Sequence, residues 1–97
     1  MLFVRTTTQF RKDVKRMKKQ GKDLRILQSV MNDIASEIPL APQYRNHPLK
    51  GNYQGRRECH LAPDWLLIYR TTAQVEDSRN GEAIFERTGS HSELFKS

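Results

Sequence analysis

Apolar residues recur at helical spacing in two segments of the N-terminal half of the chain. In the first segment they lie at positions i, i+4 and i+7, on one helical face: Phe10, Val14 and Met17. We expect this helix to begin after Thr7 or Thr8, which are good N-caps, and to end near Gln20. The second helix is expected to begin after Asp23 and to be ended by Pro39, with a regular apolar stripe: Leu24, Leu27, Val30, Met31 and Ile34. The short connection predicts an antiparallel helical hairpin.

Four further segments have the apolar alternation or the β-branched runs of strands. They are residues 2–6, 56–61, 65–70 and 82–88. A proline turn at 62–64 joins two of them, and Asn80-Gly81 is a favourable hairpin turn. Residues 90–93 carry the S-x-x-E capping-box pattern of a short C-terminal helical turn. The order β-α-α-β-β-β predicts one α+β domain over residues 1–97, with two helices on one face of a mostly antiparallel sheet of about four strands.

The sheet face away from the helices is expected to be open and polar. Because side chains alternate along a strand, Arg56, Glu58 and His60 share this face. The same alternation groups three residues of the last strand on one face: Ala83, Phe85 and Arg87. Residues 39–55 are polar and contain several prolines, so we expect a long loop of the kind that is often functional.

The formal net charge of +6 arises entirely between residues 11 and 25, where eight basic residues stand against two acidic ones. A polyanion such as RNA would suit this segment, because neutralised phosphates release their counterions. The lysines that we expect to make such contacts are Lys15, Lys18, Lys19 and Lys22. A solvated helix face, or a surface for an acidic protein, would carry the same charge.

Several protein classes are excluded by what the sequence lacks. Cys59 is the only cysteine, so the chain has neither an internal disulfide nor a zinc ribbon, and we expect a packed thiol instead of a nucleophile. The longest apolar run, residues 65–69, is far too short to span a membrane. No apolar leader is present near the N-terminus, so the cytosol is the expected compartment.

Three histidines and one aspartate carry the candidate chemistry: His47, His60, His91 and Asp64. If the later strands are neighbours in the sheet, these side chains converge at one of its ends. Imidazole titrates near pH 6.5, so two histidines can serve as general base and general acid in RNA cleavage. Cations would stabilise the charge on the phosphorane, and the candidates are Arg45, Lys50, Arg56 and Arg87.

These residues have other interpretations. Three histidines are close to the number expected by chance, and an isolated surface histidine usually has no function. Three histidines and an aspartate could also bind zinc, although neither HExxH nor paired Cys/His spacing is present. Trp65 either belongs to the core or stacks on a base, and periodicity does not distinguish the two.

Four sequence blocks resemble the YafQ branch of the RelE/ParE toxin superfamily. They are HPLKG at 47–51, GRRECH at 55–60, PDWLLIY at 63–69 and FERTGSHSELF at 85–95. The likeness extends over roughly residues 10–95, and four blocks in this order and spacing are strongly specific. It implies a toxin of a type II toxin–antitoxin pair that cleaves mRNA on the ribosome without a metal or other cofactor. The implied partners are mRNA, ribosomal RNA and a cognate antitoxin, with operator DNA bound only by the toxin–antitoxin complex and no membrane contact.

The resemblance also implies roles for individual residues. It assigns the site to His47, His60, His91, Asp64, Trp65 and Phe95. We expect the first four to be catalytic, with His47 and His91 as acid and base in either order. Trp65 is then expected to contact or support a base, and Phe95 to stack on the nucleotide or close the rim of the site. Arg56, Arg87 and Lys50 are expected to bind the substrate as well, while the four lysines named above hold ribosomal RNA.

Two features depart from the family pattern. Glu58 stands where some relatives have Asp, and the connection 71–81 is longer than expected. Two other functions fit the same fold: a ParE-like poison of DNA gyrase, which would act by binding, and a catalytically inactive binding module.

Overall fold

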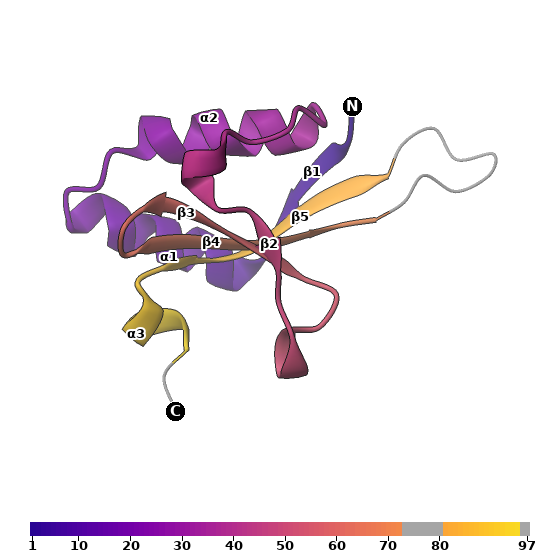
Figure 1. The fold of residues 1–97 in the computed structure, drawn as a ribbon. Coiled ribbons are helices and arrows are strands. Elements are labelled where there is room, and N and C mark those ends of the chain that lie inside the picture. The colour runs from indigo at the N-terminus through magenta and orange to yellow at the C-terminus, as the bar shows by residue number, and fades with distance from the viewer. Residues whose placement is uncertain (73–80, 96–97) are drawn as a thin grey trace.

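The computed structural model describes residues 1–72 and 81–95, and Figure 1 shows its elements. In chain order they are β1 (Phe3–Thr6), α1 (Thr8–Lys19), α2 (Leu24–Ala35), η1 (Pro42–Tyr44), β2 (His47–Pro48), η2 (Gly51–Tyr53), β3 (Arg57–Ala62), β4 (Trp65–Thr71), β5 (Glu82–Gly89) and α3 (His91–Leu94). The described strands form one sheet in the order β1-β5-β4-β3-β2. β1 is parallel to β5, and the other pairs are antiparallel. The predicted α+β fold is confirmed.

The sheet has five strands instead of about four, because the segment 39–55 is not a plain loop. It contains η1 and η2, and between them β2, which pairs His47 with Glu58 and Pro48 with Arg57. A strand of two residues has no alternation that a sequence pattern could reveal. The expected turn at Asn80 and the centre of the 71–81 connection lie outside the described residues.

The two long helices begin where their caps predict and one ends earlier than expected. Thr7 caps α1 by accepting a hydrogen bond from the backbone of Phe10, and the Asp23 side chain caps α2. α2 ends at Ala35, four residues before the expected stop at Pro39. Glu37 adopts a left-handed conformation there with φ of 60°, which turns the chain away from the helix axis. No helix within residues 1–72 and 81–95 is long and apolar enough to cross a membrane.

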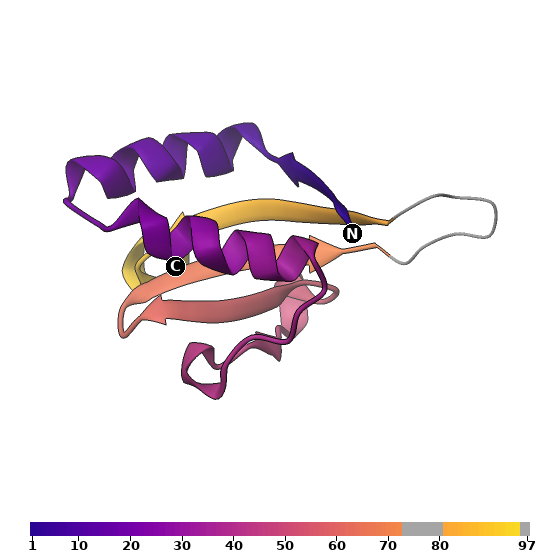
Figure 2. The same ribbon diagram turned by 90° about the horizontal axis from the view of Figure 1, so that it is seen from above.

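The main core lies between the helical hairpin and one face of the sheet. Phe10, Met17 and Leu27 pack there against strand residues such as Leu67 and Phe85, all of them buried. Figure 1 shows α2 on one side of the sheet and α3 on the other, and Figure 2 shows α1 and α2 joined as a hairpin. The second face is only partly open, because a small apolar cluster covers its centre: Leu66, Ile68, Leu94 and Leu49.

An irregularity in β5 changes which side chains share a face. Tyr69 pairs with Phe85, but the preceding Ile68 pairs with Arg87, so Glu86 is an extra residue in β5. Phe85 therefore faces the helices while Arg87 aligns with Ile68 on the second face. The expectation that Ala83, Phe85 and Arg87 share one face is wrong, because a β-bulge resets the alternation.

Candidate active site

The three histidines lie together on the second face of the sheet, although 13 to 44 positions separate them in the sequence. β2 supplies His47, β3 supplies His60 and α3 supplies His91. The ring centroids of His47 and His60 are 6.0 Å apart, and those of His60 and His91 are 5.9 Å apart. The expected convergence at one end of the sheet is therefore present, with His60 next to both other rings.

Glu58 connects two of these histidines. Its Oε2 atom lies 2.9 Å from Nε2 of His47 and 4.0 Å from Nε2 of His60. The residue is only 5% exposed, and its Oε1 atom has no hydrogen-bond partner among the described residues. Strand pairing fixes this arrangement, because Glu58 of β3 lies opposite His47 of β2. Strand alternation predicts the face on which Glu58 lies, but Glu58 is not among the predicted catalytic residues.

His60 is the most enclosed of the three histidines, with a side chain that is 17% exposed. Burial lowers its pKa below the usual 6.5, and the positive charges that His47, His91 and Arg45 can carry act in the same direction. The neighbouring carboxylate of Glu58 opposes this shift without cancelling it. His60 is therefore held as a neutral imidazole at physiological pH.

Asp64 fixes the orientation of His91. The Asp64 Oδ1 atom accepts a hydrogen bond from the backbone N–H of His91 and lies 3.1 Å from Nδ1 of its ring. These two donors lower the pKa of Asp64. With Nδ1 directed at the carboxylate, Nε2 of His91 is the ring nitrogen left for substrate. Asp64 thus orients the His91 ring from its position in the β3–β4 turn.

Trp65 does not contact the open face. Its side chain is 2% exposed and belongs to the core under the helices. The indole Nε1 donates a hydrogen bond of 2.9 Å to Thr88 Oγ1, and Thr88 in turn donates to the Leu66 carbonyl. Of the two placements that periodicity left open for Trp65, the structure has the one in the core, because the side chain points to the same side as Leu67. The hydrogen bond from Trp65 to Thr88 instead links β4 to β5 next to the site.

Phe95 lies at the rim of the site. Its ring meets Tyr53 edge-to-face at a centroid distance of 5.3 Å and lies 6.2 Å from the ring of His91. Phe95 remains 36% exposed, so one side of its ring is available for stacking. Tyr53, which lies within the predicted loop 39–55, contacts this ring from η2.

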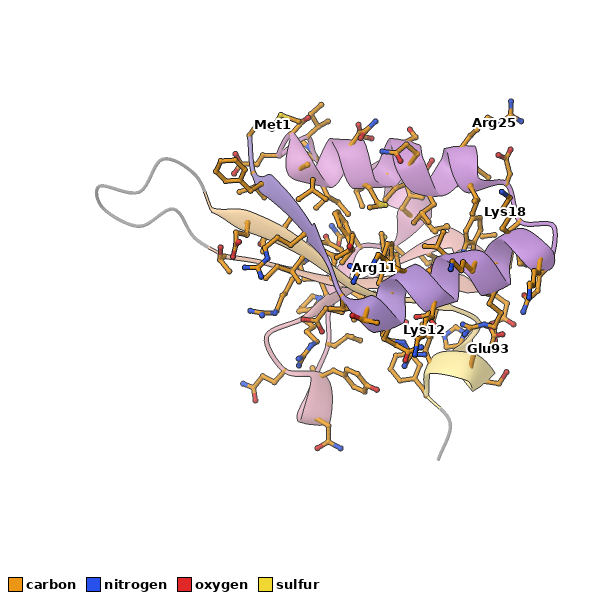
Figure 3. All side chains as sticks on the ribbon, turned by 180° about the vertical axis from the view of Figure 1, so that it is seen from behind. Met1, Arg11, Lys12, Lys18, Arg25 and Glu93 are labelled. Atoms are coloured by element: carbon orange, nitrogen blue, oxygen red, sulfur yellow. The ribbon has the colours of Figure 1, made fainter. Side chains whose placement is uncertain are left out.

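The candidate cations divide into paired and unpaired groups. Arg56 and Arg70 both donate to Glu86, the extra residue of the bulge. Arg87 is paired with Asp13 of α1. Two exposed cations make no ion pair with any described residue: Arg45, which lines the site, and Lys50. The four lysines predicted to bind RNA are exposed along α1 and just beyond it, as Figure 3 shows for Lys18.

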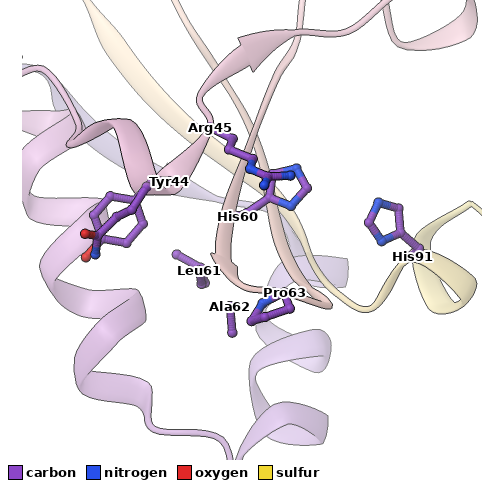
Figure 4. Close-up of a pocket in the computed structure, with 8 residues that line it drawn as sticks. Tyr44, Arg45, His60, Leu61, Ala62, Pro63 and His91 are labelled. Atoms are coloured by element: carbon purple, nitrogen blue, oxygen red, sulfur yellow. The ribbon is translucent and has the colours of Figure 1, made fainter.

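A pocket of about 600 Å³ opens beside the histidines. Its walls include Arg45, His60 and His91, and Tyr44 and Pro63 complete it. Figure 4 shows His60 of β3, His91 of α3 and the Arg45 side chain, which all line this pocket. The pocket therefore combines two imidazoles with one cation.

Three side chains could hold a metal ion. The ligand atoms of His47, Glu58 and His60 all lie within 4.8 Å of one another. Two imidazoles and a carboxylate suit Zn²⁺ and Cu²⁺. Cys59 is not part of this group, because it is fully buried and burial raises the pKa of its thiol to about 12. It is an inert core residue, as the sequence indicates.

A family model described as "Bacterial toxin of type II toxin-antitoxin system, YafQ" matches residues 2–96. This chain belongs to the YafQ toxin family. The mRNA interferase toxin YafQ of Escherichia coli K12 is 40% identical over 88 residues, which cover 90% of this chain and 88% of that protein. The resemblance found in the sequence is therefore confirmed.

Solved structures of YafQ and of another bacterial toxin have the same fold. A crystal structure of YafQ from E. coli BL21(DE3) has a TM-score of 0.85 and 35% identity, over 98% of this chain and 99% of that one. The match to an E. coli DinJ–YafQ toxin–antitoxin complex has a TM-score of 0.83 and 37% identity, over 97% of each chain. The match to a metal-bound toxin from Helicobacter pylori has a TM-score of 0.82 and 45% identity, over 98% of this chain and all of that one.

Proposed function

We propose that this protein is the toxin of a type II toxin–antitoxin pair and stops translation by cutting mRNA on the ribosome. Membership of the YafQ family and the 40% identity to an mRNA interferase support this activity. The observation that carries it is the gathering of three imidazoles from distant parts of the chain on one sheet face. The protein acts in the cytoplasm, where ribosomes and mRNA are found.

The proposed reaction needs two proton transfers and no metal. A general base removes the proton of a ribose 2′-hydroxyl, whose oxygen attacks the adjacent phosphorus. A general acid protonates the departing 5′-oxygen, which leaves a 2′,3′-cyclic phosphate on one fragment. His47 and His91 share these two roles, because their rings lie on either side of the central, neutral His60.

The other side chains orient the histidines and the RNA. Asp64 holds His91, Glu58 holds His47, and His60 lies between them. Phe95 stacks on a nucleotide with its exposed side. Lys50 and Arg45 are the cations available to the phosphate, whereas Arg56 and Arg87 are tied to carboxylates and serve mainly to shape the site.

Two macromolecular partners follow from this function. Ribosomal RNA is bound by the basic segment, through Lys15, Lys18, Lys19 and Lys22, on the side of the molecule that α1 covers. A cognate antitoxin protein neutralises the toxin, as the E. coli DinJ–YafQ complex illustrates for a relative. Operator DNA is contacted only through the toxin–antitoxin complex.

The variants His47→Ala and His91→Ala test the proposal. Each should abolish growth arrest and the cleavage of ribosome-bound mRNA while the protein still melts cooperatively. Gln28→Ala on the exposed side of α2 is the control and should cleave like wild type. Full toxicity of both histidine variants would refute the assignment. DNA damage without mRNA loss would instead indicate a gyrase poison, and ribosome binding without cleavage an inactive binding module.

A second property is proposed for the cluster of His47, Glu58 and His60: it takes up a transition-metal ion that inhibits cleavage. The buried, unpartnered Oε1 atom of Glu58 supports this, as does the metal-bound state of the H. pylori relative. A metal there would occupy the ring nitrogens that the reaction needs. Activity should therefore survive EDTA and fall on addition of Zn²⁺ or Cu²⁺, and calorimetry should show binding that Glu58→Gln weakens at least about tenfold. Activity that required an added metal would contradict this account.

A further inference from the structure

Asp13 lies on α1, outside the cluster of histidines, and is completely buried. Four groups donate hydrogen bonds to its carboxylate: Gln9 Nε2, Arg16 Nη1, Arg87 Nε and the backbone N–H of Thr88. Burial alone would raise the pKa of Asp13, but these donors outweigh it, with Arg87 first, and lower the pKa. The carboxylate is thus a permanent charge inside the molecule, held by a full set of partners.

Two of the four partners of Asp13 belong to β5, the strand that leads directly to His91. Arg87 and Thr88 are near the end of β5, and His91 follows three residues later as the first residue of α3. β1 pairs with β5 only as far as Phe85, so no strand covers the end of β5 on that side. The backbone N–H of Thr88 donates a hydrogen bond of 3.1 Å to the Asp13 carboxylate. This carboxylate takes the place of the carbonyl group that a neighbouring strand would otherwise provide.

Arg16, one turn further along α1, extends this contact to α3. Its Nη1 donates to Asp13, its Nη2 donates to the Thr88 carbonyl at 3.2 Å, and its Nε lies 2.9 Å from Oε2 of Glu93. Glu93 forms the capping box of α3 with Ser90, on either side of His91. Figure 3 shows Glu93 on α3 beside the helix α1.

Gly89 shows how closely these groups meet. A Cβ atom at this position would lie 2.7 Å from Nη2 of Arg16 and 3.0 Å from Oε1 of Glu93. The Arg16 guanidinium therefore packs directly on the backbone that connects β5 to His91. A side chain at position 89 would push Arg16 away from that connection.

We propose that Asp13 and Arg16 are positioning residues for His91, through which the basic helix α1 fixes the catalytic end of β5. Asp64 holds the ring and the backbone N–H of His91, and the Asp13–Arg16 pair holds the Thr88 backbone three residues before it. This proposal rests on the proposed function only for the role of His91. The effect of Asp13 and Arg16 on the position of the His91 ring can be measured without any substrate.

The variants Asp13→Asn and Arg16→Lys test this role, with Asp23→Asn, at the exposed N-cap of α2, as the matched control. Asp13→Asn should lower kcat for cleavage of ribosome-bound mRNA at least about tenfold, because a small displacement of a catalytic group has this effect. KM for ribosomes should stay within about twofold, because the exposed lysines are untouched. NMR spectra of the histidine rings should show altered ¹⁵N signals for His91 and unchanged signals for His47.

Arg16→Lys keeps the charge but cannot reach Asp13, Thr88 and Glu93 together, so it should cause a smaller loss in the same direction. If Asp13→Asn does not fold, Arg16→Lys still tests whether these residues position His91. Unchanged His91 signals and unchanged kcat in the folded variants would overturn the proposal. A wild-type protein that cleaves no mRNA, while Asp13→Asn still shifts the His91 signals, would refute the proposed function and leave the positioning role intact.

Discussion

Glu58 and Asp64 each contact a histidine of the site, yet burial gives the two carboxylates different properties. The Glu58 side chain is 7% exposed and that of Asp64 is 67% exposed. Glu58 therefore interacts with His47 in a medium of low dielectric constant, where the attraction between opposite charges is stronger than in water. Asp64 is surrounded by water and contributes mainly the direction of its hydrogen bonds.

The variant Glu58→Gln removes this buried charge and keeps the size of the side chain. We expect cleavage to fall by about two orders of magnitude, because the protonated form of His47 loses its counter-ion and its fixed orientation. Single-turnover cleavage of ribosome-bound mRNA measures this effect. Glu82→Gln, at an ion pair with Arg5 on the far edge of the sheet, is the control and should cleave at the wild-type rate. Equal rates for the two variants would exclude a role for Glu58.

Cys59 gives an independent check of the packing around Glu58. Because burial raises the pKa of its thiol to about 12, the native protein should not react measurably with a thiol reagent at pH 8. The unfolded protein in urea should react at the rate of a free cysteine. Rapid labelling of the folded chain would mean that β3 is open, and that the contacts of Glu58 are not as described.

At the scale of elements, the sequence predicted well those segments that have a long, regular pattern. The caps at Thr7 and Asp23 marked the starts of both helices, and the four predicted strands correspond to β1, β3, β4 and β5. β2 escaped prediction because it has two residues, and the bulge at Glu86 because it depends on pairing with β4. These two features nevertheless place His47 and Arg87 on the second face.

The short helix α3 should depend on one apolar anchor. Leu94 is 4% exposed and packs against Leu66 and Ile68, whereas the rest of α3 is largely at the surface. Leu94→Ala should cost about 2–4 kcal/mol in the free energy of unfolding and reduce cleavage further by releasing His91. Urea unfolding and cleavage assays test this, with Ile38→Ala at an exposed apolar residue as the control. A stable, fully active Leu94 variant would contradict the account of α3.

The basic helix makes a prediction about salt. Replacement of Lys15, Lys18, Lys19 and Lys22 by Gln should weaken binding to ribosomes and reduce the slope of log K against log salt by up to about three. Binding measured by sedimentation at several salt concentrations tests this. Because the replaced side chains are exposed, the melting temperature should hardly change. An unchanged slope would leave these lysines with a solubility role or a place in the antitoxin interface.

At the scale of the whole molecule, the two long helices and the catalytic groups occupy opposite faces of one sheet. The helical hairpin buries one face and carries the excess positive charge, and the histidines lie on the other. The sequence identified all three histidines, because each occupies a family motif. It could not reveal that Trp65 is core, nor that Asp13 connects the two faces, because those facts depend on contacts between distant segments.

This arrangement predicts how the whole fold responds to acid. The pKa values of Asp13 and Glu93 are lowered from 3.8 and 4.5, respectively, by their hydrogen bonds. A carboxylate with a lowered pKa in the folded state adds stability above its unfolded pKa and loses it as the pH falls through the folded pKa. Stability in urea should therefore decline below about pH 4.5, and Asp13→Asn should show a shallower decline. Equal pH profiles would mean that Asp13 is not ionised in the folded protein.

The most direct measurement of the central claim uses RNA in which sulfur replaces the 5′-oxygen of the scissile phosphodiester, bound to ribosomes. A sulfur leaving group needs no protonation, so it makes a general acid dispensable. His47→Ala and His91→Ala should both fail to cut normal mRNA, and one of them alone should regain near wild-type cleavage of the sulfur substrate. Wild-type cleavage of normal mRNA by both variants, or rescue of neither, would contradict acid–base catalysis by these two imidazoles.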